Sequence, residues 1–541
     1  MTKNELSFPI FFGIAVAIGI LIGSYFDFEN KLALFKNSKE EKIKKLIGYI
    51  QYNYIEEVAT DSLLDDAIKN IVSKLDPHSY YISKEEQALA SENMNGEFVG
   101  IGINFMILND TVVVSNIIED SPSSFAGLKR GDRIISANQQ RLFKEDLISK
   151  DPKSEQKTIT STIVDALKGV VGSEVSLEVY RKTSGKKLNI PVKRAPVTIK
   201  SISGYYMINP QLGYINIRRF SKNTAVEFNA ALCNLIDEGM TSLVLDLRGN
   251  PGGYIGVAER IADEFLEKGR LIFSTKNSKG EEAKAFATDY GDFKQGELYI
   301  LIDRNSASSS EVVAGTLQDN DRSLIIGRRS FGKALVQEEM DLGDGSVVRL
   351  TTSQYFTVSG RSIQKPFDKS KPHDDYFKET TNRITSGELL SKELIEVDEK
   401  QAFSTFKGRK VYGGSGIIPD VFIPLNKFEI DQLTTGYHRK IKNFTLRYLD
   451  DERAHFEKIN QQDFIANYRI EETVLEECIK ELGFDFTYQN HKKQKLEIAI
   501  KSILARNIFN ETAYFKVSHT EDKMMNKVIE IHTKKQTKQA F

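Results

Sequence analysis

The apolar residues of this chain recur with two different periods, and the change of period divides the chain into regions. From residue 40 to 92 the spacing is helical, as in Ile43, Leu46, Ile47 and Ile50. From residue 96 to 195, short β-rich runs separated by turn residues take over, as expected for strands. One segment there, Thr158–Leu167, returns to helical spacing.

Residues 196–428 alternate between the two patterns. Apolar runs typical of strands occupy Leu212–Ile217, Ser242–Leu247, Leu298–Ile302, Ser323–Ile326 and Val347–Thr351. Helical patterns occupy Thr224–Glu238, Ile255–Glu267 and Ser310–Gln318. Such alternation predicts an α/β fold. From residue 428 onward the chain is polar with scattered aromatic residues, and we expect mostly helix.

The length of 541 residues corresponds to three or four domains at ~150 residues per domain. We therefore predict an α/β multidomain protein. Its parts are a helical N-terminal region (31–92), a small β-rich domain (93–195), an α/β core (196–428) and a mostly helical C-terminal extension of unknown role (429–541). Residues 1–30 are predicted to be a transmembrane anchor or a signal segment.

The segment Phe8–Phe26 carries no charge. At 1.5 Å per residue, a helix of this length nearly crosses a hydrocarbon core of ~30 Å. We interpret it as an uncleaved single-pass anchor; a cleaved signal peptide and a buried core helix are the alternatives. One lysine precedes the segment and six follow it by residue 45, a distribution that favours keeping the large domains inside the cell.

Composition excludes several classes of function. There are 74 basic and 75 acidic residues, so no overall positive charge favours nucleic acid. The two cysteines cannot form a four-cysteine zinc site, and no H-E-x-x-H motif occurs. We therefore expect no metal site of either kind, and the resemblance described below implies no metal or organic cofactor.

A run of small hydroxyl residues, Asn305–Ser310, lies between a predicted strand and a predicted helix. The pattern Ser308-x-x-Glu311 is a capping box, so Ser308 can be an ordinary helix cap. The alternative is a nucleophile at a strand-to-helix turn, where free N–H groups at the helix start stabilise a developing oxyanion.

A serine nucleophile requires a base, and Lys333 is the candidate in Gly332-Lys333-Ala334. Burial lowers the pKa of a lysine, because the charged form is desolvated, and Arg328 and Arg329 add repulsion if they face it. Taken alone, Lys333 is also compatible with an ordinary surface lysine. Ser330-x-x-Lys333 also fits the nucleophile motif of penicillin-binding enzymes, but its companion motifs K-T-G and S-D-N are absent from the sequence.

A third segment, Asp246-Leu247-Arg248-Gly249-Asn250-Pro251-Gly252-Gly253, follows a predicted buried strand. Its glycines permit backbone N–H groups to approach a reacting carbonyl. A plain tight turn or a phosphate-binding turn is the alternative, although no G-K-[ST] follows.

Together these three segments resemble the carboxyl-terminal processing (tail-specific) serine proteases, which carry D-L-R-x-N-x-G-G, S-A-S-x-S-E and F-G-K-x-x-V-Q in this order. The resemblance covers roughly residues 40–425. It implies a ClpP/crotonase-like core with Ser308 as nucleophile, Lys333 as general base and Gln337 orienting that lysine. It also implies a supporting role for Asp319. The oxyanion hole would use the N–H groups of Ser309 and of either Gly252 or Gly253.

The resemblance extends to a PDZ domain, through Phe98-Val99-Gly100-Ile101-Gly102 and Ala126-Gly127-Leu128. An extended peptide would pair with its edge strand, while Val99, Gly100, Ile101 and Gly102 offer N–H donors to a terminal carboxylate. Ile159, Ile163 and Leu167 would line a pocket for an apolar last side chain; the alternative is that they belong to the domain core.

The resemblance implies a serine endopeptidase that recognises apolar, free C-terminal tails and cleaves through an acyl-enzyme intermediate. It places the catalytic domains on the periplasmic side of the cell membrane, against the lysine distribution. A catalytically silent PDZ binding or chaperone protein and a penicillin-binding-type acyl enzyme using Ser330 are the rival hypotheses. Protein or peptide substrates are the expected partners, with a homo-oligomer or an activating adaptor as further candidates.

Overall fold

The structure is a computed structural model that describes residue 18 and residues 38–143, 159–426, 429–430, 436–483 and 490–539. The chain divides into two compact units, one ending at Lys74 and one beginning at Leu75. The first unit contains α2 (Ser38–Asn53) and α3 (Thr60–Val72), in the region predicted to be helical.

The prediction of a membrane anchor is contradicted. In the part of the chain that the structure describes, no helix combines the length and the apolar character needed to cross a membrane. The segment 8–26 itself lies outside the described residues, apart from Ile18. We therefore withdraw the assignment to a single-pass membrane protein with its catalytic domains in the periplasm.

The second unit is built on a sheet with strand order β10-β11-β12-β15-β16-β21. The strands are β10 (Ile202–Met207), β11 (Leu212–Ile217), β12 (Ser242–Asp246), β15 (Glu297–Ile302), β16 (Leu324–Gly327) and β21 (Val421–Phe422). β10 is antiparallel to β11, and the other pairs are parallel. This sheet and its helices confirm the predicted α/β fold class.

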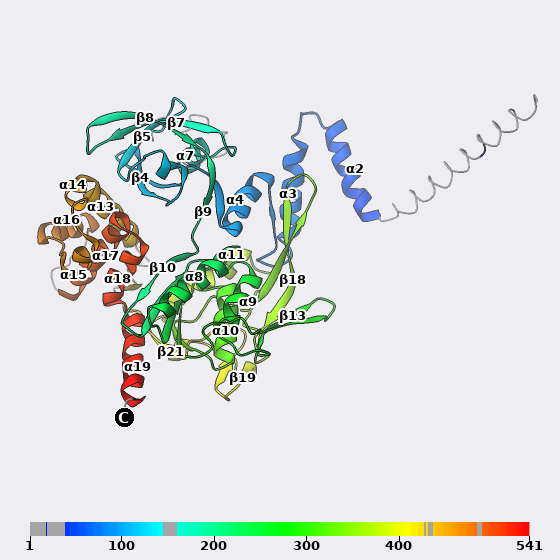
Figure 1. Cartoon of the computed structure of the whole chain (residues 1–541). Helices are drawn as coiled ribbons and strands as arrows, with labels where there is room; N and C mark the ends of the chain where they lie inside the picture. The colour runs from blue at the N-terminus through cyan, green and yellow to red at the C-terminus, as the bar shows by residue number, and fades with distance from the viewer. Residues whose placement is uncertain are drawn as a thin grey trace, which may run out of the picture. The chain divides into compact units, whose positions relative to one another are not determined.

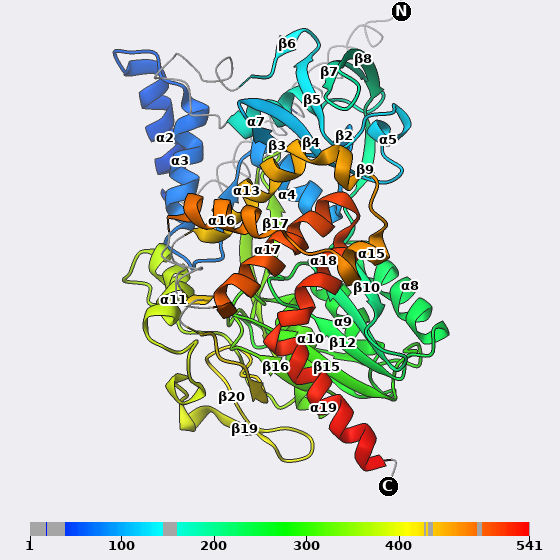
Figure 2. The same cartoon turned by 90° about the vertical axis from the view of Figure 1, so that its left-hand side faces the viewer.

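Helices cover both faces of this sheet (Figures 1 and 2). They are α8 (Thr224–Asp237), α9 (Ile255–Asp263), α10 (Ser309–Asp319), α18 (Glu511–Ser518) and α19 (Lys523–Gln539). On β12, Leu243 and Leu245 face the cluster that contains α8, α9 and α10. Val244, between them, faces Phe515 and Met525 from the end of the chain. The alternation of side chains along a strand thus gives each face its own core, and the last two helices complete the second one.

A second, antiparallel sheet lies beside the first and consists of β1 (Tyr80–Ile82), β18 (Val347–Phe356), β13 (Leu271–Asn277), β14 (Glu282–Phe286) and β17 (Leu335–Asp341). Among these strands, the pattern analysis identified only the first half of β18. The register between β17 and β18 shifts between Val336 and Gln337, and Gln337 lies opposite Thr351.

The small β-rich domain contains the sheet β3-β4-β5-β7-β8, with β3 at its edge and β6 paired to β5. Its strands are β3 (Ile103–Leu108), β4 (Thr111–Ile117), β5 (Asp132–Ala137), β6 (Gln140–Arg141), β7 (Glu174–Arg181) and β8 (Lys186–Lys193), with helices α5 (Pro122–Phe125) and α7 (Ile159–Leu167). β2 (Glu97–Gly100) and β9 (Ala195–Thr198) pair where the chain enters and leaves this domain.

A helical domain follows the α/β core in sequence and contacts both the small domain and the core (Figure 2). It contains α13 (Tyr437–Asp451), α14 (Arg453–Phe456), α15 (Gln461–Asn467), α16 (Glu472–Leu482) and α17 (Asn490–Ile508). Arg130 of the small domain donates to the carbonyls of Asn507, Ile508 and Phe509 at the end of α17. A cation there also complements the helix dipole, so the small domain is fixed to this helix end.

On the core side, Arg248 forms an ion pair with Asp522 at 2.6 Å, just before α19. Arg248 also pairs with Asp246 at the end of β12.

The remaining elements are α4 (Lys84–Asn95), α11 (His373–Thr385), η1 (Lys392–Leu394), η2 (Glu399–Gln401), β19 (Ala402–Ser404), β20 (Lys410–Tyr412) and η3 (His519–Glu521). The boundary between the α/β core and the C-terminal extension, placed between residues 428 and 429, stays a prediction. The C-terminal extension includes α18 and α19.

Candidate active site

Ser308 occupies the turn between β15 and α10. It is the N-cap residue of α10 and has φ 54° and ψ −116°. A non-glycine residue in such a sparsely populated conformation costs on the order of 1–3 kcal/mol and is typical of functional sites. The side chain is half-buried, whereas Ser309 and Ser310 behind it are buried. Ser308 therefore stands at the accessible, electropositive start of a buried helix.

The small hydroxyl residues around Ser308 attach its turn to the glycine-rich turn. Hydroxyl groups of Ser306, Ser309 and Ser310 donate to the carbonyls of Leu247, Gly253 and Asn250, respectively, at 2.8–3.0 Å. The N–H of Ala307 also donates to the Asn250 carbonyl. These bonds explain why serines recur here: each hydroxyl donates to a backbone carbonyl of the glycine-rich turn and so ties the two turns together.

The two candidate glycines are not equivalent. The N–H of Gly252 donates to the Asn250 side chain at 2.8 Å. A Cβ on Gly252 would come within 2.8 Å of the Ser308 Cβ, so glycine is required for this approach. Among the described residues, no hydrogen-bond partner is found for the N–H groups of Gly253 and Ser309. Gly253 is therefore the better candidate for a donor to an oxyanion.

Lys333 lies in the loop that precedes β17. Burial, helped by the positive charge of Arg349 and opposed by the negative charges of Glu311 and Asp76, lowers the pKa of its amine to about 8. Arg349, rather than Arg328 or Arg329, supplies the repulsion. Within the described part of the chain, no hydrogen bond joins the Lys333 amine to Ser308.

Glu311 connects the loop of Ser308 to the loop of Lys333. It is fully buried, and its Oε2 accepts from the N–H groups of Ser308 and Lys333, each at 2.9 Å. Its Oε1 accepts from the Gly332 N–H at 2.7 Å and from the Ser330 hydroxyl. The S-x-x-E pattern predicted only the first of these bonds.

Ser330, the rival nucleophile, is fully buried. Its hydroxyl donates to Glu311 and accepts from the Ile417 N–H at 2.6 Å. Both sides of this oxygen are thus occupied by protein groups. The geometry favours a structural role for Ser330 and argues against the penicillin-binding hypothesis.

The two other predicted site residues, Gln337 and Asp319, bond to partners other than Ser308. Gln337 donates through Nε2 to the Thr351 hydroxyl at 3.2 Å. Asp319, at the far end of α10, is buried and pairs with Arg361 at 2.8 Å. It also accepts from the hydroxyls of Thr357 and Ser359. Asp319 therefore holds the loop after β18, in keeping with a supporting role.

Pattern analysis missed Asp76 and His78, which precede β1. The charge of Lys333 contributes, after burial, to lowering the pKa of His78 to about 3, so this ring is neutral at physiological pH. The charge of Asp76 acts on Lys333 in turn. In the sequence, the segment Leu75-Asp76-Pro77-His78-Ser79 resembles the N-terminal helical region of the same protease family, and this resemblance indicates no role for either residue.

The small domain presents a groove between the edge strand β3 and helix α7. It has a volume of about 360 Å³ and is lined by Ile103, Asn104, Phe105, Met106, Ile107, Thr160 and Val164. Ile163 and Leu167 are instead buried in the domain core, and Ile159 packs against it. We therefore correct the pocket assignment: residues at i and i+4 from Ile159 face the core, and those one position further along face the groove.

None of the predicted carboxylate-binding residues lines this groove, although Gly102 directly precedes Ile103, which does. Val99 and Gly100 belong to β2, where they pair with Pro196 and Ala195. Ile101 and Gly102 form the connection to β3, with Ile101 buried in the domain core. Ile101 and Gly102 are therefore the only two of the four predicted residues that lie outside the strands.

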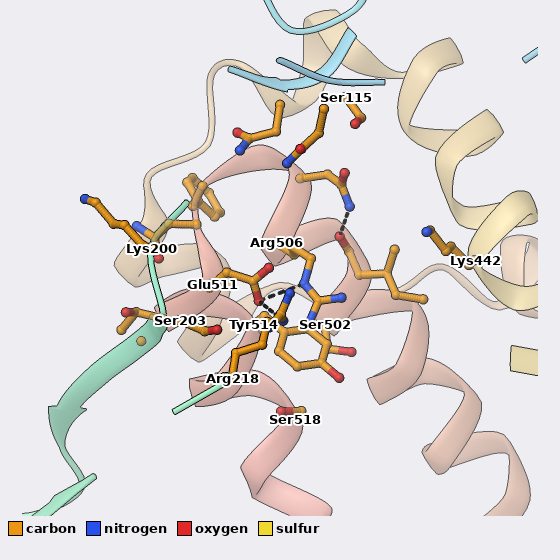
Figure 3. A pocket seen from close by; sticks show the side chains of 18 of the residues that line it. Ser115, Lys200, Ser203, Arg218, Lys442, Ser502, Arg506, Glu511, Tyr514 and Ser518 are labelled. Atoms are coloured by element: carbon orange, nitrogen blue, oxygen red, sulfur yellow. Dashed lines mark hydrogen bonds and ion pairs between the residues drawn. The ribbon is translucent and has the colours of Figure 1, made fainter. Parts of the chain in front are cut away.

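A cavity of about 1280 Å³ is shown in Figure 3, and neither Ser308 nor Lys333 is among the residues that line it. The small domain, the start of the α/β core and the helical domain all contribute to its walls. Figure 3 shows Arg218 and Arg506 on one carboxylate, Glu511, at 3.7 and 3.0 Å. The ring of Tyr514 lies 3.7 Å from the Arg506 guanidinium carbon.

Parts of this chain are similar to known protein families and to individual known proteins. The sequence profile of peptidase family S41 matches residues 211–373, that of the PDZ domain residues 99–192, and that of a family of unknown function (DUF8443) residues 437–510. The carboxy-terminal processing protease CtpB of Bacillus subtilis is 32% identical over 365 residues, which are 66% of this chain and 72% of that protein. A carboxy-terminal-processing protease of Bartonella bacilliformis is 31% identical and covers 61% of this chain and 74% of its own length. Among solved structures, the photosystem II D1 C-terminal processing protease is 22% identical with a TM-score of 0.35, covering 71% of this chain and 86% of that one.

Proposed function

Because this chain belongs to the carboxy-terminal processing proteases of peptidase family S41, serine proteases here joined to a PDZ domain, we propose that Ser308 is its nucleophile and Lys333 its general base. The observation that carries this proposal is the Glu311 carboxylate, which binds backbone groups of both residues. It holds the nucleophile turn and the base loop together in a water-excluded place.

In this mechanism Ser308 Oγ attacks the scissile carbonyl and its proton passes to the neutral Lys333 amine. The N–H groups of Ser309 and Gly253 stabilise the oxyanion. The Lys333 ammonium then returns the proton to the leaving amine, and water hydrolyses the acyl-enzyme. Among the described residues no hydrogen bond joins Ser308 to Lys333, and active-site bonds of this kind often tighten only in the complex.

We also propose that the PDZ domain binds the free, apolar C-terminus of a substrate protein. β3 offers an unpaired edge for strand addition, and the groove beside it is lined largely by apolar side chains. In this proposal the docked tail draws the dyad into its bonded arrangement. A homo-oligomer or an activating adaptor stays a prediction.

Tail recognition is tested with a matched pair of peptides. We expect a peptide that ends in an apolar residue with a free carboxylate to be cleaved faster than the same peptide amidated at its C-terminus. The amide loses the charge that the N–H groups near Gly102 would bind. Initial rates at equal concentration measure the effect, and equal rates for both peptides would refute tail recognition.

The pH profile tests the base. Only the neutral Lys333 amine accepts a proton, so kcat/KM should rise with pH through a midpoint near the pKa of about 8. Between pH 7 and pH 9 the neutral fraction rises about tenfold. A profile that is flat across this range, or that falls, would exclude Lys333 as the base.

A further inference from the structure

The Gln337 amide is linked to a carboxylate far away in sequence. Its Nε2 donates to the Thr351 hydroxyl at 3.2 Å, and that hydroxyl donates to Asp76 Oδ1 at 3.0 Å. Gln337 and Thr351 are opposite each other on β17 and β18, so their side chains share one face of the sheet. A row of three side chains thus connects the segment before β1 to the strand after Lys333.

The chemistry of the three groups fixes the direction of every bond. An ionised carboxylate only accepts, so the single hydroxyl hydrogen of Thr351 is committed to Asp76. The Thr351 oxygen therefore presents a lone pair to Gln337, so the Gln337 side chain donates to it through its NH2 group. The carbonyl oxygen of the amide is consequently turned away from Thr351 and can accept from an amine.

Asp76 is itself firmly held. Its Oδ1 also accepts from the His78 N–H at 2.9 Å, and its Oδ2 accepts from the Ser79 hydroxyl at 2.6 Å. The Thr351 N–H donates to that same Ser79 hydroxyl at 3.0 Å. Such a network allows little rotation of the carboxylate, so its effect on Thr351 is well defined.

The network lies close enough to Lys333 for their charges to interact. Around the Lys333 amine, Asp76 and Glu311 supply negative charge and Arg349 supplies positive charge. The neighbouring His78 is neutral at physiological pH. Asp76 is thus both the end of the hydrogen-bond row and one of the charges that surround the base.

We infer that Asp76 is a positioning residue for the proposed base: through Thr351 it fixes the orientation of Gln337, whose carbonyl oxygen then holds the Lys333 amine toward Ser308. This inference rests on the proposed function. It assigns a catalytic purpose to the Leu75–Ser79 segment, which lies outside the matched protease region.

The test uses the full chain with Asp76→Asn, Thr351→Val, Thr351→Ser and, as a matched control, Thr352→Val. The Thr352 hydroxyl donates to the exposed Glu338, so its loss should leave kcat unchanged. Thr351→Val should lower kcat about 10- to 100-fold with little change in KM, because a misplaced base loses orientation. Thr351→Ser keeps the hydroxyl and should restore most of the activity.

Asp76→Asn should lower kcat and also move the pH midpoint of kcat/KM downward, because removing a negative charge disfavours the ammonium form. Thr351→Val removes no charge and should leave the midpoint in place. If Asp76 and Thr351 had a purely structural role, both substitutions would lower the free energy of unfolding, and the two variants would not differ in the pH midpoint of kcat/KM. An unchanged kcat in Thr351→Val, or a failure of Thr351→Ser to restore it, would overturn the inference.

A second measurement does not depend on turnover. In the Ser308→Ala background, the rate of Lys333 acetylation against pH, followed by peptide-resolved mass spectrometry, reports the titration of the amine directly. Asp76→Asn should shift its midpoint to lower pH, and an unshifted midpoint would overturn the inference in any case. If the wild type cleaves nothing but the midpoint shifts, the proposed function fails while the coupling of Asp76 to Lys333 stands.

Discussion

Turnover should fall at least ~10³-fold when Ser308 is replaced by alanine, a loss of about 4 kcal/mol of transition-state stabilisation. The hydroxyl is the only atom group removed, and the Glu311 bond to the backbone of residue 308 remains. Lys333→Ala should have an effect of similar size, because members of a catalytic unit are not additive. Initial rates on a peptide with a free apolar C-terminus measure both variants.

Ser370→Ala, at an exposed serine, is the matched control and should cleave at the wild-type rate. The unfolding midpoint of Ser308→Ala should be close to that of the wild type. A loss of turnover then reflects the missing hydroxyl and not a loss of folded protein. Full activity in Ser308→Ala would place the nucleophile elsewhere. If activity were lost instead in Ser330→Ala with its fold intact, the S-x-x-K hypothesis would be favoured despite the buried position of Ser330.

Glu311→Gln is the second variant with a large expected effect, on stability and activity together. The carboxylate receives four donors, two on each oxygen, whereas an amide offers only one accepting oxygen. In either orientation its NH2 group faces at least one backbone N–H, of Gly332 or of Ser308 and Lys333. Each buried donor left unpaired costs about 1–3 kcal/mol.

We therefore expect Glu311→Gln to lower the free energy of unfolding by about 3 kcal/mol or more, measured by urea denaturation, and to abolish most turnover. Glu338→Gln on the exposed side of β17 is the isosteric control and should have little effect. Wild-type stability and rate in Glu311→Gln would show that the carboxylate does not organise the two loops.

The sequence predicted the local features of the site well and its long-range contacts poorly. Helical periodicity placed α8 and α10 to within a residue or two, although only α8 buries a single face and every residue of α10 is buried. The motif resemblance correctly identified a protease of this family. The contacts that the sequence did not predict join distant segments, such as Glu311 with Gly332 or Thr351 with Asp76. The spacing of apolar residues along the chain does not encode such pairings.

The pocket of the PDZ domain shows a different kind of failure. Ile159, Ile163 and Leu167 were identified by their shared helical face, which is correct. A shared apolar face, however, does not distinguish a domain core from a ligand groove, since both are apolar. The smaller residues beside them, Thr160 and Val164, were overlooked because they lack that pattern.

The position of α18 and α19 on the central sheet has a consequence for how the protein is made. β16 ends at Gly327, while α18 begins at Glu511, roughly 180 residues later in synthesis. At ~5–20 residues per second, a ribosome needs about 10–40 s to cover this distance. During that interval Tyr214, Val244 and Leu301 have no helix to cover them. The nascent chain thus exposes an apolar sheet face until its last helices emerge, and a chaperone that binds exposed apolar surface would act in this interval.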